Sequence, residues 1–195
     1  MNEWLVVAGI VAVAISGLPG LVLRTRGAGE RLTAGFVVAG ALAAITGSLR
    51  ALVAPETAAP IRLPWQVPLG SFHVELDALS AMFEIQVFLL AALGAIYALA
   101  YWRQVDHPGN GRKLRACYGL MVAGMALLGV ARNAILFMAG WELMAIGAFL
   151  SITTEDDLVR TREVGTLYLI ATRVATLCVI AALALLVGAL DSPEI

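Results

Sequence analysis

The sequence predicts an all-α, polytopic membrane protein with six transmembrane helices and a short external hairpin between the second and the third. Of its 195 residues, 61% are hydrophobic and only 14% are charged. Soluble domains average about 25% charged residues, so a water-solvated globule is the wrong class. The 13 basic and 14 acidic residues nearly cancel, which excludes a basic nucleic-acid-binding protein.

Six apolar segments reach the roughly 17 to 25 residues needed to cross about 30 Å of hydrocarbon. They are Trp4 to Leu23, Leu32 to Val53, Asp77 to Tyr101, Leu114 to Ala131, Ala134 to Ile152 and Val164 to Leu190. A single helix from Leu114 to Ile152 would measure about 58 Å, so Arg132 and Asn133 mark a turn. A soluble helical bundle is the alternative, but it needs charged outer faces, and the first segment has no charge. We therefore expect one membrane domain over residues 1–195.

Basic residues gather in alternate connections between these segments. The first connection holds Arg24, Arg26 and Arg31, the third Arg103, Arg112, Lys113 and Arg115, and the fifth Arg160 and Arg162. The other connections hold only Arg62 and Arg132, with Arg50 near a helix end. By the positive-inside rule, three loops lie in the cytoplasm and both termini lie outside it, which predicts a multi-pass protein of the cell (inner) membrane.

The external segment, residues 54–76, differs in composition from the segments around it. Its prolines exclude a regular helix; they are Pro55, Pro60, Pro64 and Pro68. Apolar residues alternate with others, at Ile61, Leu63, Trp65, Val67 and Leu69 before Gly70, and again at Phe72, Val74 and Leu76. The alternation predicts a short hairpin on the outer surface, with a plain ordered loop as the alternative.

Small residues predict close packing of the first two segments. They recur at every fourth position, at Ala8, Ala12, Ser16 and Gly20 in the first and at Gly35, Ala39, Ala43 and Gly47 in the second. A sequence rich in Ala and Gly also produces such stripes by chance. Pro19, near the end of the first segment, either kinks that helix or ends it.

Three ionisable residues, Glu84, Glu142 and Arg173, remain well inside the apolar segments. Each costs at least about 2.5 to 3.5 kcal/mol there unless it is paired, hydrated or turned inward. Glu142 lies about 12 Å from the outer end of its segment, and Arg173 about 14 Å from the inner end of the next, antiparallel one. We therefore expect an ion pair near mid-membrane. Thr172 and Thr176 share a helix face with Arg173, which indicates contact with protein or water.

Glu84 is shallower and shares a helix face with Asp77 and Ser80, so this face is a candidate mouth of a polar path. A membrane carboxylate suits proton handling, because desolvation favours its protonated form and a neighbouring cation favours its charged form. Arg173 keeps its proton, so it pairs with a charge without relaying one. The alternative for Glu142 and Arg173 is a fixed ion pair that orients two helices and carries nothing.

Three parts of the sequence carry a family resemblance: Asp77 to Phe83 (DALSAMF), then Asn133, Phe137 and Trp141 to Met144 (WELM), and Tyr168 to Thr176. They resemble the antiporter-like proton-translocating subunits of respiratory complex I, of membrane-bound nickel-iron hydrogenases and of Mrp cation/proton antiporters. The similarity covers roughly Trp65 to Ala189. Within the family, these sequence motifs are most similar to those of hydrogenase-4 component B and of formate hydrogenlyase subunit 3.

This resemblance implies a membrane subunit of an oxidoreductase complex that has no redox site of its own. It implies that Glu142 pairs with a Lys on a seventh helix and forms part of a proton half-channel. Together with the face patterns above, this gives a candidate proton pathway of Glu142, Arg173, Glu84, Asp77, Thr172 and Thr176. Its expected partners are other membrane subunits, including helices that supply the missing mid-membrane Lys, and the lipid bilayer.

The sequence departs from the family in its length and in its mid-membrane residues. Family members are much longer and have several mid-membrane Lys or His residues, whereas Lys113 is the only Lys here and lies in a connection. Either the chain is the N-terminal portion of such a subunit, with its partner helices on another polypeptide, or Arg173 has taken the cationic position and conduction is impaired.

Other chemistry has no support in the sequence. Cys117 and Cys178 lie in separate segments without metal-ligand spacing, and His73 and His107 lie on opposite sides of the membrane. We therefore expect no catalytic residue, no cofactor and no metal. Three function classes remain: a proton-translocating module of a redox complex, a non-conducting structural or assembly subunit, and a small stand-alone ion transporter. The sequence leaves open whether the ion is H⁺ or Na⁺.

Overall fold

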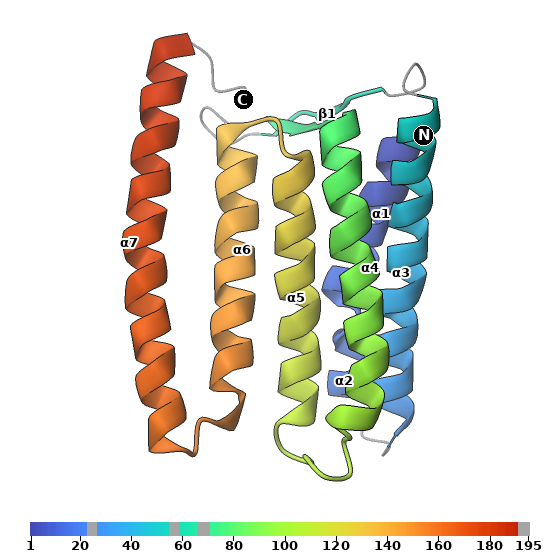
Figure 1. Ribbon diagram of the computed structural model, residues 1–195, viewed down its shortest axis with the longest axis vertical. Helices are drawn as coiled ribbons and strands as arrows, with labels where there is room; N and C mark the ends of the chain where they lie inside the picture. Colours follow the sequence, from blue (N-terminus) through green and yellow to red (C-terminus); the bar gives the residue numbers. More distant parts are fainter. Residues whose placement is uncertain (23–26, 55–58, 66–70, 191–195) are drawn as a thin grey trace.

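The computed structural model describes residues 1–22, 27–54, 59–65 and 71–190, which form long helices with a two-stranded hairpin at one end (Figure 1). The elements are α1 (Asn2–Ile15), α2 (Leu18–Val22), α3 (Ala28–Val53), β1 (Ile61–Leu63), β2 (Phe72–Val74), α4 (Ala78–Tyr101), α5 (Gly111–Val130), α6 (Ala134–Ile152) and α7 (Val159–Leu190). Six helical segments in the described part of the chain are long and apolar enough to cross a membrane, the first being Asn2–Gly20. The predicted six-helix membrane fold is therefore confirmed.

The first membrane-spanning segment is broken between α1 and α2. Pro19 has no N–H to donate to the preceding turn, so a regular helical ladder cannot continue through it. The backbone N–H and the hydroxyl of Ser16 both donate to the carbonyl oxygen of Val13, at 3.2 and 2.7 Å. Gly17 lies against the backbone of Ala116 on α5, where a Cβ atom has no room. Pro19 therefore interrupts the helix where the chain passes close to α5.

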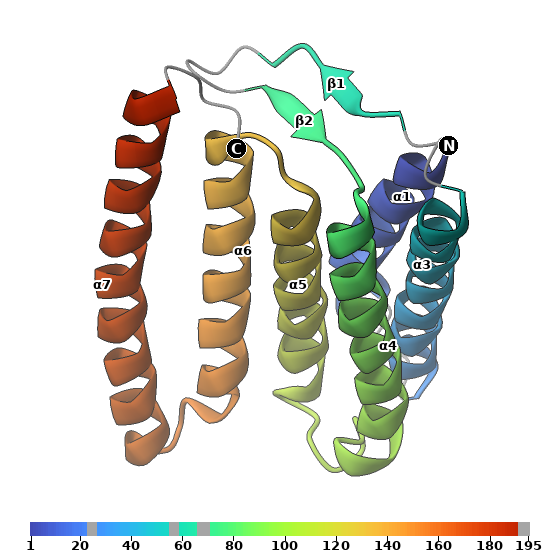
Figure 2. The ribbon, with the colours of Figure 1, turned by 45° about the horizontal axis from the view of Figure 1, so that its top comes forward.

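The helices pack asymmetrically. The first four membrane-spanning segments surround a buried core that includes Val13, Val37, Phe88 and Val122. α6 packs on α5, and α7 packs on α6, so that these helices form a row leading away from the core (Figures 1 and 2). Only 6% of the most apolar stretch of α7 is buried, against 44% of the corresponding stretch of the first membrane-spanning segment. The bundle is closed around α1 and open along α7.

α1 and α3 approach each other through glycine. A Cβ atom at Gly9 would lie 2.6 Å from the carbonyl oxygen of Gly40 and 2.7 Å from the Cβ of Ala44. Such close backbone contact is a common way for helices to associate in lipid. The predicted stripes are wrong for part of their length, since Ala8 and Gly35 lie on exposed sides of their helices. The helix crossing, and not the four-residue spacing alone, selects the contact face.

β1 and β2 form a hairpin between α3 and α4. They pair antiparallel, with Ile61 opposite Val74, Arg62 opposite His73, and Leu63 opposite Phe72. Ile61 and Val74 are buried and belong to the apolar core. Several residues of the predicted hairpin lie outside the described residues: Pro55, Val67, Pro68, Leu69 and Gly70.

The hairpin is tied to the turn between α5 and α6. The backbone N–H of Glu75 donates to the carbonyl of Val130 at 3.1 Å, and that of Arg132 donates to the carbonyl of His73 at 3.0 Å. Figure 2 shows the two strands lying across the bundle end that carries the N-terminus. The turn predicted at Arg132 and Asn133 is confirmed, and the hairpin fixes its position.

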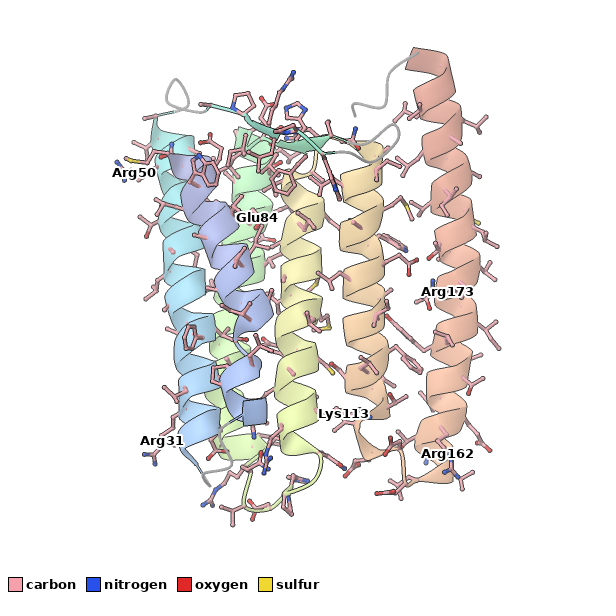
Figure 3. The ribbon with its side chains drawn as sticks, turned by 180° about the vertical axis from the view of Figure 1, so that it is seen from behind. Arg31, Arg50, Glu84, Lys113, Arg162 and Arg173 are labelled. Atoms are coloured by element: carbon pink, nitrogen blue, oxygen red, sulfur yellow. The ribbon has the colours of Figure 1, made fainter. Side chains whose placement is uncertain are left out.

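Basic side chains are distributed between the two ends of the bundle. Figure 3 shows Arg31, Lys113 and Arg162 at the end opposite the hairpin and Arg50 at the hairpin end. The three connections predicted to be basic therefore share one end. Arg24 and Arg26, which contribute to the same prediction, lie outside the described residues.

Candidate functional site

The predicted ion pair between Glu142 and Arg173 is present. Nη1 of Arg173 donates a hydrogen bond to Oε2 of Glu142 at 2.8 Å. Asn133 caps α6 by accepting the N–H of Ile135 at 3.0 Å, which fixes where the helix begins. Glu142 lies about 12 Å further along the axis. The antiparallel α7 brings Arg173 to the same depth, near the middle of the helix (Figure 3).

Both oxygens of the Glu142 carboxylate have a protein partner. The hydroxyl of Thr176 donates to Oε1 at 3.2 Å, while Arg173 holds Oε2. The Thr176 hydroxyl in turn accepts a hydrogen bond from the indole Nε1 of Trp141 at 3.0 Å. The chain Trp141, Thr176, Glu142 and Arg173 therefore fixes the orientation of the carboxylate between α6 and α7. The sequence reasoning used Trp141 only as part of a motif and missed this contact.

Thr172 does not contact the Glu142 carboxylate. Its hydroxyl donates to the carbonyls of Tyr168 and Leu169 on its own helix, at 2.8 and 3.0 Å. A threonine hydroxyl in a helix commonly makes such a backbone bond, because the carbonyl of the preceding turn lies within reach. Of the two candidate threonines, the structure brings Thr176 to the pair and leaves Thr172 beside it.

The ion pair lies at the open edge of the bundle. The side chains of Arg173 and Glu142 are 46% and 31% exposed, although both lie well inside apolar helices. Ionised groups at this depth face protein or a water-filled cavity in membrane proteins, because exposure to acyl chains is costly. The exposed side of the pair therefore requires a polar or protein neighbour.

A second polar cluster lies at the hairpin end of α4. Asp77 caps this helix by accepting the N–H of Ser80 at 2.7 Å, and it also pairs with Nη2 of Arg132 at 3.1 Å. The same guanidinium donates to the Ser80 hydroxyl at 3.0 Å. Burial acts to raise the pKa of Asp77, but the Ser80 hydrogen bonds and the Arg132 charge outweigh it and hold the pKa below its usual range.

Glu84 lies deeper on the same face of α4. Its side chain is almost fully buried, with 1% of the residue exposed. Neither carboxyl oxygen has a hydrogen-bond partner among the described residues. On the neighbouring α5, Gly129 faces Oε1 of Glu84 so closely that a Cβ atom at this position would collide with it. Within the described part of the chain, Glu84 is thus a membrane-embedded carboxyl group without an ion-pair partner.

The candidate residues form two separate sites. Asp77 and Glu84 belong to α4, whereas Glu142 and Arg173 join α6 and α7. Figure 3 shows Glu84 and Arg173 on opposite sides of α5 and α6, and the ribbon in Figures 1 and 2 has the same separation of α4 from α7. The six candidates therefore do not line one continuous contact network in the described part of the chain.

Two further buried or nearly buried acidic residues were missed by the sequence reasoning. Glu3 accepts the N–H of Ala59 at 3.0 Å and pairs with the terminal ammonium of Met1. Glu30 accepts the N–H of Gln104 at 2.9 Å and lies 3.7 Å from a guanidinium nitrogen of Arg115. Both lie in the first turn of a helix, the one signal that the sequence offered. Their contacts hold connecting segments against helix ends.

Metal ligation finds no support in this geometry. Among residues 1–22, 27–54, 59–65 and 71–190, no three His, Cys, Asp or Glu side chains gather in an arrangement that would hold a metal ion. His73 instead accepts a hydrogen bond from Nε of Arg62 at 3.3 Å within the hairpin. The carboxyl groups on α4 and α6 are therefore the chemically informative groups.

No protein-family model matches the chain. In sequence, it is 30% identical over 165 residues to an uncharacterized protein of Mycobacterium tuberculosis, a match that covers 83% of this chain and 24% of that protein. It is 32% identical over 94 residues to the Na⁺/H⁺ antiporter subunit A1 of Staphylococcus haemolyticus, covering 47% of this chain and 11% of that subunit. The chain thus spans about a quarter or less of the length of these relatives.

Solved structures share the fold over nearly the whole chain. A chain of the membrane-bound sulfane sulfur reductase, an archaeal respiratory membrane complex, superposes with a TM-score of 0.74 at 14% identity, covering 96% of this chain and 28% of that one. A chain of the Mrp complex from Dietzia sp. superposes with a TM-score of 0.69 at 19% identity, covering 99% and 20%. This chain therefore has the fold of a segment of subunits that belong to multisubunit membrane complexes.

Proposed function

We propose that the chain is an antiporter-like, proton-translocating part of a multisubunit membrane complex, in which Glu142 takes up and releases the proton. The observation that carries this proposal is the 2.8 Å bond between Glu142 and Arg173 inside apolar helices. The fold shared with respiratory and Mrp complexes and the partial similarity to an antiporter subunit support the same class.

The geometry suits a carboxylate whose charge is controlled by a movable cation. In a low-dielectric medium, a cation beside a carboxylate favours the ionised form, and its departure favours the protonated form. Arg173 keeps its own proton, so it acts by position, whereas Glu142 is the group that titrates. Thr176 holds the second carboxylate oxygen at 3.2 Å, so the carboxylate keeps its orientation when Arg173 moves.

The exposed edge along α7 supports the presence of partner helices. Glu142 is 31% exposed toward a side that only α7 partly covers, and most of the surface of α7 is free in this chain. We propose that helices of other membrane subunits, or of a longer polypeptide, cover this edge and supply the mid-membrane Lys that the family resemblance implies. A complex of the hydrogenase-4 or complex I type is the candidate context, with no cofactor bound by this chain.

The distribution of basic residues supports a proposal for the orientation in the membrane. Arg31, Lys113 and Arg162 lie at one end of the bundle, opposite the hairpin (Figure 3). We propose that this end faces the cytoplasm and that the hairpin end, with the N-terminus and the last turn of α7, faces the other side of the cell (inner) membrane. Glu142 then lies between the two aqueous phases.

A structural role is the second candidate. The contacts of Trp141 and Thr176 immobilise the Glu142 carboxylate, as a locked pair that only orients α6 and α7 would require. A structural pair and a proton-carrying pair respond differently to Glu142→Gln. Loss of the charge in a structural pair reduces assembly and leaves proton movement per assembled complex unchanged, whereas loss of the titrating group in a transport site abolishes proton movement per assembled complex. A small stand-alone transporter is the third candidate, and it would require activity of the purified chain in liposomes.

The test is Glu142→Gln in sealed membrane vesicles that contain the complete complex. We expect coupled proton movement per assembled complex to fall to the level of vesicles without the protein, although the unpaired Arg173 also lowers the amount of assembled complex. Glu163→Gln is the matched control, because Glu163 is an exposed carboxylate near the start of α7. A drop in assembly with unchanged movement per complex would support the structural role instead.

A further inference from the structure

Glu84 differs from the other carboxylates that the structure places in polar contacts. Glu3, Glu30, Asp77 and Glu142 each accept a hydrogen bond from a described residue. Glu84 has no such donor, although only 1% of its surface is exposed. An ionised carboxylate buried without a donor or a counter-charge is far costlier than a neutral acid, so burial of this kind selects the protonated form.

The room that the Glu84 carboxyl occupies is made by a neighbouring glycine. On α5, the missing side chain of Gly129 makes room for Oε1. On α3, Ser48 lies about 8 Å from the helix end, close to the depth of Glu84, which lies about 9 Å from the start of α4. The Ser48 hydroxyl is also buried without a hydrogen-bond partner among the described residues. Ser48 therefore adds an uncharged hydroxyl, and not a counter-charge, at a similar depth.

The charged groups at the hairpin end of the bundle are the ones to consider as partners of Glu84. Asp77 and Arg132 neutralise each other at 3.1 Å, and Arg50 lies at the same end of α3 and is exposed. α5 contributes no charged residue near Gly129, since its basic residues lie in its first turns at the opposite end. Glu3 on α1 is held by Ala59 and Met1. No described cation is thus in a position to balance an ionised Glu84.

We propose that Glu84 is a neutral carboxylic acid that forms a second proton-binding site, separate from the pair of Glu142 and Arg173 and reached from the hairpin end along α4. Its use in transport rests on the proposed function, whereas its protonation does not. Binding transfers a proton from a hydronium ion to the Glu84 carboxylate and leaves a water molecule; release is the reverse step.

Ser80 connects this site to the aqueous end. It precedes Glu84 by four residues, so the two side chains lie one above the other on α4. The Ser80 hydroxyl oxygen accepts from Arg132 at 3.0 Å, which leaves its hydrogen free to be donated toward the helix interior. Asp77 and Arg132 mark the entrance one turn higher. The proposed route therefore runs from the pair of Asp77 and Arg132 past the Ser80 hydroxyl to the buried acid, and a water molecule has to bridge the last step because Glu84 has no hydrogen-bond partner among the described residues.

Infrared spectroscopy of the protein in its membrane tests this proposal without measuring transport. The wild-type spectrum minus that of Glu84→Gln should contain a carboxylic-acid C=O band at neutral pH that shifts in D₂O. The difference with Glu142→Gln should instead contain carboxylate bands, because Glu142 is paired with Arg173. Carboxylate bands in the Glu84 difference would overturn the proposal, and so would an acid band that never shifts in D₂O.

Three further variants separate a folding defect in Glu84→Gln from loss of the acid and test the route to it. Glu84→Asp keeps the acid and should shift the C=O band without removing it. Ser80→Ala should slow the D₂O shift of the Glu84 band several-fold and leave its initial position unchanged, while Ser151→Ala, which removes a hydroxyl on α6 that bonds the Gly147 carbonyl, should have no effect. Equal rates in Ser80→Ala and wild type would exclude the route through Ser80. A neutral Glu84 in a protein that moves no protons would leave this inference standing and reject the proposed function alone.

Discussion

Glu84 and Glu142 are the same residue type at a membrane-embedded position, yet the protein treats them in opposite ways. Glu84 lies in the closed part of the bundle, 1% exposed and without a donor. Glu142 lies at the open edge, with Arg173 on one oxygen and Thr176 on the other. The comparison teaches that two membrane carboxyls on one bundle have opposite surroundings: one is buried without a donor among the described residues, and the other is held between a guanidinium and a hydroxyl.

Arg173→Leu should have the largest effect, because it leaves Glu142 without its cation. An unpaired charge at the centre of a membrane helix costs at least about 2.5 kcal/mol, so we expect a large fall in protein abundance or a forced protonation of Glu142. Quantitative immunoblotting and proton-movement assays measure the two outcomes. Arg173→Lys should retain part of the protein abundance and part of the proton movement, since a compact ammonium charge replaces the planar guanidinium group.

A double variant sharpens this prediction. Glu142→Leu combined with Arg173→Leu removes both charges and should restore abundance without restoring proton movement. Wild-type abundance and wild-type proton movement in Arg173→Leu alone would show that the ion pair contributes neither to stability nor to transport. The partner of Glu142 would then not distinguish it functionally from Glu84.

Gly129→Ala should have the next largest effect, because the added Cβ atom meets Oε1 of Glu84. The opposing atom is the far end of a flexible side chain, so we expect a cost near the lower end of the roughly 1 to 3 kcal/mol typical of overpacking. We expect a lower thermal unfolding temperature in detergent, and we expect Glu84→Ala to suppress the effect by removing the opposing carboxyl.

Gly35→Ala is the matched control for this prediction. No atom lies within 4 Å of a Cβ built at Gly35, which is also in a helix, so the substitution should be neutral or stabilising by up to about 1 kcal/mol. If Gly129→Ala lowers stability equally in the wild-type and Glu84→Ala backgrounds, the carboxyl does not occupy the space that Gly129 provides.

Asp77→Asn should have the smallest effect. It removes the charge opposite Arg132 but keeps a side chain that caps α4, so we expect a loss of less than about 1 kcal/mol. The pKa of Asp77 is lowered in the folded protein from its usual 3.8, so its stabilising effect is present above that pH and disappears as the pH falls through the lower folded pKa.

The pH dependence provides the check on this last prediction. The stability difference between wild type and Asp77→Asn should be constant at neutral pH and vanish in acid, as measured by thermal unfolding across pH. Asp106→Asn is the control, because Asp106 and Arg103 form an exposed pair at 4.0 Å. A difference that grows in acid would mean that the charge of Asp77 is unfavourable in the folded protein.

Much of this fold follows from the sequence, because hydrocarbon thickness imposes a minimum length on each apolar helix. The turn at Arg132 and the strands around Ile61 and Val74 were predictable from length and alternation. The start of α7 was not: the helix begins at Val159, before the predicted apolar segment that starts at Val164. Its first turns carry charged residues, which end an apolar run without ending a helix.

The sites were predictable only in part. Equal depth in adjacent antiparallel helices was enough to predict the contact of Glu142 with Arg173. The contact of Gly129 with Glu84 was not predictable, since it joins two helices through an absent side chain. The bond between Trp141 and Thr176 depends on helix rotation, which sequence spacing within one helix does not determine.

The most direct test of the account is the rate of proton movement per assembled complex in Glu142→Gln, compared with Glu163→Gln at equal abundance. The account predicts that removing the acid at mid-membrane abolishes movement, while the exposed control keeps the wild-type rate. Wild-type movement in Glu142→Gln would contradict the central claim that Glu142 is the group that takes up and releases the proton.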